Sequence, residues 1–114
     1  MNNLNNKVQL IGNLGIDPEV KMTSGNRKVA KLRLATSEVR YTKTGEKTTE
    51  TQWHNLIAWG GLAEVCEKYL TKGQEIAIEG KLSYRIYTDK DNNKQFITEI
   101  TVNDLMMISN RKAG

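Results

Sequence analysis

Cysteine, histidine and proline are nearly absent from this chain of 114 residues, since each occurs only once. The single cysteine, Cys66, excludes a disulfide within the chain, and with one histidine it leaves too few ligands for a zinc site. Apolar runs of about 18 residues, the length of a membrane-spanning helix, do not occur, and the first residues lack the pattern of a secretory signal. We therefore expect no metal, no cofactor, no membrane partner and a cytoplasmic location.

The residues that are present have the composition of a folded domain. Hydrophobic residues make up 38% of the chain and charged residues 26%, a balance that disordered proteins do not show. A chain of 114 residues holds one hydrophobic core and has little room for a second. We expect a single domain over residues 1–114, folded from about residue 5 to about 108.

Positive charge is concentrated in one segment. The net charge is +4, and residues 21–50 carry eight basic and three acidic residues, whereas residues 51–114 carry eight of each. A basic segment of this kind suits a polyanionic partner such as nucleic acid, although a solvated face of any protein can also collect lysines. Charge alone therefore leaves both interpretations open.

Apolar and polar residues alternate along most of the chain, which is the pattern of β-strands. Leu32 and Leu34, for example, share one face of their segment, while Lys31 and Arg33 share the other. Five strands are predicted in this way: residues 7–14, 27–38, 53–59, 75–88 and 95–108. The fourth alternates over an unusually long span, so we expect it to protrude past the core.

Two stretches interrupt the predicted strands. Residues 62–70 place apolar side chains at helical spacing and precede Lys72 and Gly73, a basic last turn with a glycine cap, so they predict one short helix. Cys66 lies in this helix, and we expect it to be a buried, inert thiol. Residues 39–50 are polar and predict a long hairpin loop, a projecting arm with the composition of a mobile segment, between the second and third strands.

The aromatic residues divide into two groups. Trp53 and Trp59 share one face of the third predicted strand, and His54 lies on the other. A tryptophan on a strand is, without further context, more often packed in a core or an interface than exposed to a ligand. Three other rings align with apolar neighbours and are expected in the core: Tyr69, Tyr84 and Phe96.

Five strands with one helix between the third and fourth match the order of a Greek-key barrel of the oligonucleotide-binding type, the OB fold. Blocks of sequence then resemble bacterial single-stranded DNA-binding proteins: NKVQLIGNLGIDPEV, VAKLRLATSE, TGE, WHNLIAWG, LAEV, YLTKGQEIAIEGKL and YTD. The resemblance implies a mainly β, five-stranded OB-fold subunit of a homotetramer. It also implies binding of single-stranded DNA with little sequence preference, in nucleoid-associated replication, recombination and repair.

The resemblance also implies the roles of individual residues. Base stacking is expected on Trp53, Trp59, Tyr87 and Tyr41. Phosphate contacts are expected from eight cations: Lys7, Lys31, Arg33, Arg40, Lys43, Lys72, Lys81 and Arg85. The histidine of the WH pair, His54, is expected at a subunit interface. Exposed rings among cations are what a sequence-tolerant binder of single strands needs, because every base has a flat face and every nucleotide a charge.

Two other functions compete with DNA binding as interpretations of the sequence. A metal-dependent nuclease needs carboxylates that converge on one ion, and the candidates fall in separate turns and strand ends: Asp17, Asp89, Asp91 and Asp104. We therefore expect no enzymatic activity. A primosomal accessory or protein-interaction module of the same fold is the alternative, and it is disfavoured because the stacking rings are retained.

The end of the sequence departs from the family pattern. Family members usually continue into a flexible linker and an acidic tip that ends in phenylalanine and recruits replication and repair enzymes. This sequence ends at NRKAG, so we expect the acidic tail to be absent and the partners that it recruits to be lost. The sequence fits both a shortened chain and a naturally tailless one.

Overall fold

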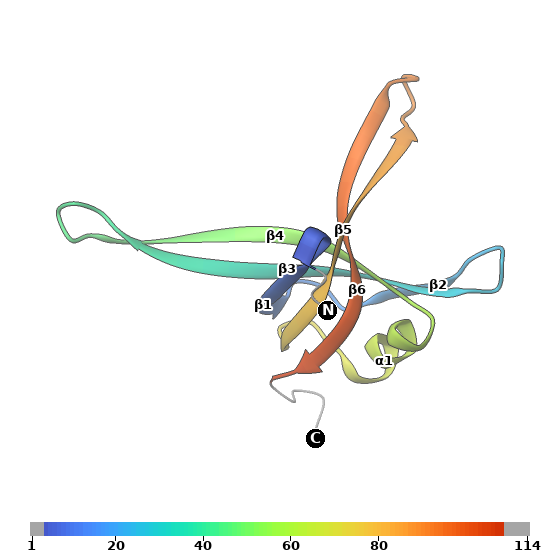
Figure 1. Ribbon diagram of the computed structural model, residues 1–114, viewed down its shortest axis with the longest axis horizontal. Helices are drawn as coiled ribbons and strands as arrows, with labels where there is room; N and C mark the ends of the chain where they lie inside the picture. The colour runs from blue at the N-terminus through green and yellow to red at the C-terminus, as the bar shows by residue number, and fades with distance from the viewer. Residues whose placement is uncertain (1–3, 109–114) are drawn as a thin grey trace.

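Strands make up most of the computed structural model, which describes residues 4–108 (Figure 1). In chain order the elements are a 3-10 turn Leu4–Asn6, β1 Val8–Leu14, β2 Glu19–Met22, β3 Lys28–Tyr41, β4 Lys47–Trp59, α1 Gly61–Tyr69, β5 Glu75–Thr88 and β6 Lys94–Met107. Within the described residues, no helix is long and apolar enough to cross a membrane.

The sheet closes into a barrel because β1 pairs at both of its edges. The strand order is β1-β5-β6-β4-β3-β2, and β1 also pairs with β3 through Asn13 opposite Ala35 and Leu14 opposite Leu34. Five strands therefore form the ring, with α1 between β4 and β5, which confirms the predicted OB fold. The short β2 pairs only with β3 and was not predicted, because four residues after Pro18 are too few to show a period.

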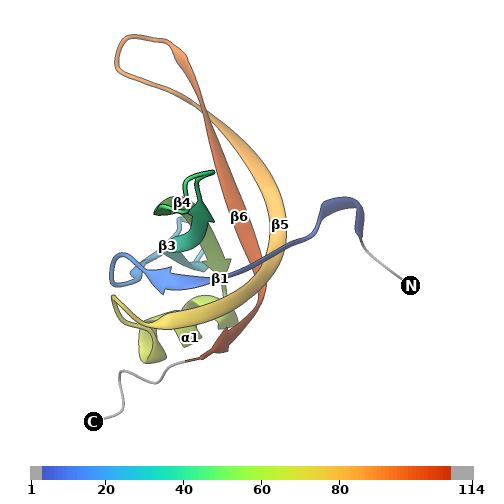
Figure 2. The same cartoon turned by 90° about the vertical axis from the view of Figure 1, so that its left-hand side faces the viewer.

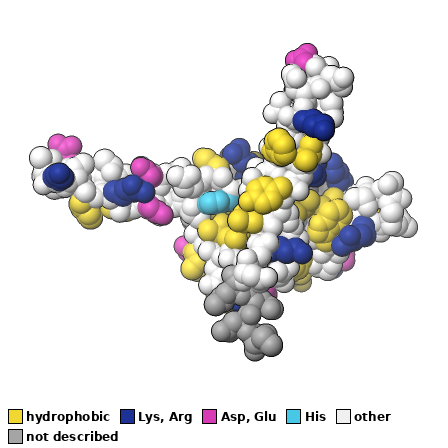
Figure 3. Space-filling model, turned by 45° about the horizontal axis from the view of Figure 1, so that its top comes forward, with side chains coloured by type: hydrophobic (Ala, Val, Ile, Leu, Met, Phe, Trp, Pro, Cys, Tyr) yellow, Lys and Arg dark blue, Asp and Glu magenta, His cyan; other side chains and the backbone are white. Residues whose placement is uncertain are grey.

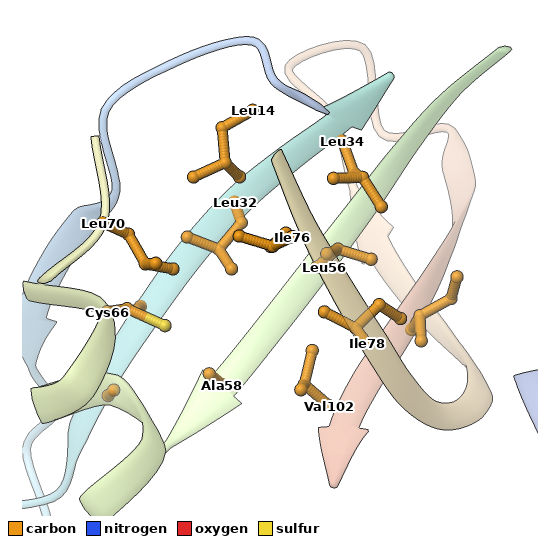
Figure 4. Close-up of a cluster of buried hydrophobic side chains, with 13 residues drawn as sticks. Leu14, Leu32, Leu34, Leu56, Ala58, Cys66, Leu70, Ile76, Ile78 and Val102 are labelled. Atoms are coloured by element: carbon orange, nitrogen blue, oxygen red, sulfur yellow. The ribbon is translucent and has the colours of Figure 1, made fainter. Parts of the chain in front are cut away.

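The core fills the barrel and extends to α1 at one end (Figure 4). Leu32, Leu34, Leu56 and Ile76 point inward from three different strands and are at most 2% exposed. Each such side chain stabilises the fold by about 1.5 to 3 kcal/mol relative to an exposed one. Cys66 of α1 lies in the same cluster, and burial raises the pKa of its thiol to about 11, so the reactive thiolate is rare at neutral pH.

Two long hairpins project from the barrel in different directions (Figures 1 and 2). The first is formed by β3 and β4, which pair as far as Tyr41 opposite Lys47 and turn through residues 42–46. Residues 39–50 therefore form the predicted hairpin, but most of them are paired strands, and the loop is limited to the turn. Both faces of this hairpin are solvated, so its sequence shows no apolar alternation, although the backbone hydrogen bonds of the ladder still form.

The second hairpin, β5 with β6, protrudes as predicted, but it exposes aromatic residues that were expected in the core. Tyr84 and Phe96 are each 72% exposed, and Tyr69 of α1 is 52% exposed. Tyr84 lies on the same side of β5 as the buried Ile76 and Ile78, but β5 has left the barrel by the time it reaches Tyr84. Alternation fixes the side of the strand and does not say whether another element covers it.

Gly12 allows β1 to approach β3 closely enough to close the barrel. A β-carbon at Gly12 would lie 2.2 Å from the carbonyl oxygen of Ala35, whereas nothing lies within 4 Å of one at Gly25. We expect Gly12→Ala to lower the free energy of unfolding by about 1 to 3 kcal/mol, and Gly25→Ala to leave it nearly unchanged. Chemical denaturation of both variants measures the difference, and equal stabilities would contradict this account of closure.

Candidate nucleic-acid interface

The two tryptophans lie on the outer face of the barrel, defined here as the outward side chains of β3, β4, β6 and β5. On β4, Trp53 and Trp59 point outward, and Leu56 and Ala58 between them are buried. Trp53 stands opposite Ala35 of β3, and Trp59 stands opposite Val29. The predicted orientation of the rings is therefore correct, and Trp53 is half exposed.

Each tryptophan has an arginine against its ring. The guanidinium carbon of Arg33 lies 5.1 Å from the ring centroid of Trp53, and that of Arg27 lies 4.4 Å from the centroid of Trp59. Such contacts stabilise exposed sites by about 0.5 to 1 kcal/mol and hold the ring and the charge together. Arg33 was predicted as a phosphate contact, but Arg27 was not. Arg27 directly precedes β3 and has the same alternation as Lys31 and Arg33, so the strand period could have found it; its contact with Trp59 depends on the register between β3 and β4.

Gly15, which follows β1, leaves the space in which the Trp53 ring packs. A β-carbon at Gly15 would lie 2.3 Å from Cζ3 of Trp53, so the indole packs directly against the glycine backbone. The Gly15 N–H donates to the carbonyl of Arg33 at 2.8 Å, which ties this backbone to β3. Sequence inspection gave no sign of this contact, since the two residues are far apart in the chain.

A hollow of about 250 Å³ lies on the outer face where β3, β4 and the stem of the β5–β6 hairpin meet. We call it the central hollow; the polar residues in its wall are Glu19, Lys31, Arg33, Asn55, Arg85 and Glu99. Three of the predicted phosphate-contact cations thus come together from β3 and β5. Arg85 forms an ion pair with Glu99 at 3.1 Å, and no ion pair involves Lys31 or Arg33 in the described range 4–108.

The two hairpins carry further predicted residues outward from the central hollow. Tyr87 lies on the β5–β6 hairpin, on the same side of β5 as Arg85, and is exposed. Tyr41 lies at the end of β3 and Lys43 in the turn that follows, so both are at the tip of the β3–β4 hairpin. Figure 3 shows cationic and acidic side chains close together along that hairpin. One of its cations, Arg40, is paired with Glu50 at 3.5 Å.

Other predicted residues lie away from the central hollow. Lys7 is paired with Glu79 at 3.4 Å, and Lys72 follows α1, with its backbone N–H donating to the Asp17 carboxylate at 2.8 Å. Lys81 is exposed on β5, outside the lining of the hollow. The His54 ring lies 2.9 Å from the Thr36 hydroxyl through Nε2 and is partly buried.

One basic residue of the charged segment, Lys28, is paired with acidic residues of α1. The ammonium of Lys28 lies 2.7 Å from the carboxylate of Glu67 and 3.7 Å from that of Glu64. Its hydrogen bond to Glu67 raises the pKa of Lys28, so it stays cationic and neutralised by its partners. The basic segment is therefore not uniformly available: Lys31 and Arg33 face the central hollow, whereas Lys28 holds β3 against α1.

The side chains of the outer face are suited to bind a ligand that has flat groups and negative charge. Indole rings next to guanidinium groups accept flat, apolar groups that carry negative charge, because stacking and Coulomb attraction act at the same place. Within the described residues, no group of three or more His, Cys, Asp or Glu side chains is arranged to hold a metal ion.

Comparison with known proteins identifies close relatives. The model of the Single-strand binding protein family matches residues 5–108. Single-stranded DNA-binding protein 1 of Chlorobaculum tepidum is 42% identical over 110 residues, 96% of this chain and 68% of that protein. The Single-stranded DNA-binding protein of Xylella fastidiosa (strain Temecula1) is 38% identical over 109 residues, 96% of this chain and 66% of that protein. This chain therefore spans about two thirds of the length of both.

Two solved structures share the fold. The structure described as a Plasmodium falciparum SSB complex with ssDNA superposes with a TM-score of 0.83 at 33% identity, over 96% of this chain and 100% of that one. A deletion mutant of the single-stranded DNA binding protein from Thermus aquaticus gives 0.79 at 29% identity, over 93% of this chain and 51% of that one.

Placing a methyl group at Gly15 tests how Trp53 is held. In a Trp59→Phe background, where Trp53 is the only emitting indole, Gly15→Ala should displace the ring, because a β-carbon would lie 2.3 Å from it. We expect a shifted emission maximum and stronger quenching by acrylamide. Gly61→Ala, where nothing lies within 4 Å of the added carbon, is the matched control. Identical emission from both variants would refute the contact.

Proposed function

The chain belongs to the single-strand binding protein family, and from that premise we propose that its outer face binds single-stranded DNA with little preference for sequence. The observation that carries this proposal is the placement of Trp53 and Arg33 beside the central hollow, where Lys31 and Arg85 add positive charge. The solved relative that superposes over the whole of its length is described as a complex with ssDNA.

Binding combines two kinds of contact on this face. Bases stack on Trp53 and Trp59, and each stacked base contributes about 1 to 3 kcal/mol whatever its identity, because every base has a flat π-face. Phosphates lie against Lys31, Arg33 and Arg85, where condensed counterions are released. Neither contact reads the edge of a base, so the binding tolerates any sequence.

The two hairpins extend the contact surface beyond the barrel. Tyr87 continues the line of Arg85 along β5, and Tyr41 with Lys43 offers a second ring and cation at the tip of the β3–β4 hairpin. A strand bound at the central hollow can follow either hairpin, so these residues are proposed as outer stacking and phosphate contacts. Lys7, Lys72, Lys81 and Arg40 are proposed as weaker phosphate contacts at the margins.

Binding of this kind protects single strands in replication, recombination and repair, and requires no covalent step. The protein is accordingly proposed to act as a non-enzymatic binder, in the cytoplasm and associated with the nucleoid, where such strands arise.

Titration with oligo(dT) tests the proposal. We expect the DNA to quench tryptophan fluorescence and to remain uncleaved. Trp53→Ala should weaken binding by about 1 to 3 kcal/mol. Lys31→Ala should reduce the slope of log affinity against log salt by about 0.7, the value for one phosphate contact on a single strand. Lys28→Ala, whose cation is already paired with Glu67, is the matched control and should keep the slope. No quenching, or cleavage of the oligonucleotide, would overturn the proposal.

We also propose that the chain self-associates, as a homotetramer. Ile11 of β1, Ala77 of β5 and Met106 of β6 are neighbours in register, and both Ile11 and Met106 are exposed although apolar. They border a hollow of about 570 Å³. Figure 3 shows further hydrophobic side chains along the stem of the β5–β6 hairpin. Exposed apolar groups in a contiguous set are typical of protein interfaces. His54 is proposed to lie at an interface in the same assembly.

The molar mass in solution tests self-association. The wild-type chain should have the mass of a tetramer by light scattering, and Ile11→Lys should lower it, because a buried lysine without a partner is costly in an interface. Val39→Lys places the same side chain at an exposed apolar position on the β3–β4 hairpin and should leave the mass unchanged. A monomeric wild-type chain would contradict the proposal.

A further inference from the structure

Glu99 is a carboxylate in a place where a polyanion is proposed to bind. It lies in the wall of the central hollow and is only 7% exposed. Its negative charge repels a phosphate. Its burial also removes most of its hydration, which is unfavourable for a charged group without a partner. No sequence pattern pointed to this residue. A buried negative charge in this position therefore requires a specific partner.

That partner is Arg85. Glu99 binds only one edge of its guanidinium group, the edge formed by Nε and Nη2. Nη2 donates to Oε2 at 3.1 Å and Nε donates to Oε1 at 3.4 Å. Nε and Nη2 form the side edge of the planar group, so the contact is bidentate and fixes the plane as well as the position. Arg85 is itself half exposed, and an arginine on an exposed strand otherwise samples many rotamers.

The remaining edge of the guanidinium is left for a ligand. Nη1 and the second hydrogen of Nη2 form the end edge, and Arg85 has no other hydrogen-bond partner in the part of the chain that the structure describes. Two parallel N–H donors match two non-bridging oxygens of a phosphate. Lys31 and Arg33 line the same hollow from β3, so a phosphate there meets positive charge from both sides.

We propose that Glu99 is a positioning residue that fixes Arg85 so that its end edge binds a backbone phosphate of single-stranded DNA in the central hollow. This inference rests on the proposed function of the outer face. Removal of the negative charge of Glu99 from the hollow should therefore weaken the binding of a polyanion, although charge alone would predict the opposite. The weakening arises because Arg85 loses its fixed orientation and must be ordered again when DNA binds.

The matched comparison is with Glu19, a second carboxylate in the wall of the same hollow. Glu19→Gln removes the same unit of charge without altering Arg85, so labelled oligo(dT) should bind about twofold more tightly, as for an exposed charge. Glu99→Gln turns an amide NH₂ toward the guanidinium donors, and binding should weaken about five- to tenfold, the scale of one net hydrogen bond. Tighter binding by Glu99→Gln would overturn the inference.

A double-mutant cycle separates positioning from a structural role. In an Arg85→Ala background Glu99 has nothing to position, so Glu99→Gln should then strengthen binding instead of weakening it. The same loss of affinity in both backgrounds would show that Glu99 acts by some other route and would overturn the inference.

Arg85→Lys supplies a test that leaves the buried residue untouched. Lysine keeps the charge but cannot form a side-edge pair and present a second fixed edge, so binding should weaken by about the same factor as for Glu99→Gln. Affinity equal to that of the wild-type chain would refute the positioning role. If the wild-type chain itself fails to bind oligo(dT), the proposed function fails; if it binds and the variants disagree with these signs, only the inference fails.

Discussion

The double pairing of β1, with β5 along one edge and with β3 along the other, is the constraint on which the rest of the structure depends. It turns an open sheet into a ring, so that alternate residues of the barrel strands must point either into one shared core or outward. Gly12 makes this possible because a side chain there would collide with the Ala35 carbonyl. Once the ring is closed, the outward residues of β3, β4, β6 and β5 form one continuous surface.

Electrostatics on that surface depends on pairing more than on the number of charges. Lys28 and Arg40 belong to the basic segment, yet carboxylates neutralise both, those of Glu67 and Glu50 among them. Lys31 and Arg33 keep their charge facing the central hollow. Net charge is a weak guide to a binding site for this reason, since a cation that is already paired gains less from a phosphate. The Arg85–Glu99 pair differs, because only one edge of its guanidinium is occupied.

The alternation of apolar and polar residues predicted correctly to which side of a strand a residue points, but it did not predict whether another element covers that side. It placed Trp53 and Trp59 on one face of their strand and Leu56 on the other, because the side of a strand to which a residue points is fixed by its position in the alternation. It failed for Tyr84 and Phe96, which stand on a hairpin that extends beyond the barrel. It also gave no sign that the predicted hairpin over residues 39–50 is mostly paired strand, because a ladder solvated on both faces has no apolar signal, although its backbone pairs as far as Tyr41.

The sequence by itself determined the succession of the five barrel strands and the single helix along the chain, the common face of the two tryptophans and the cations of β3, because each is a local pattern or a block shared with the family. Only the tertiary structure decided which of these residues meet. Gly15 against Trp53, Arg27 over Trp59 and Glu99 beside Arg85 each join residues from separate segments. Such contacts follow from strand register and barrel closure, which are set by pairing between distant parts of the chain and leave no trace in local spacing.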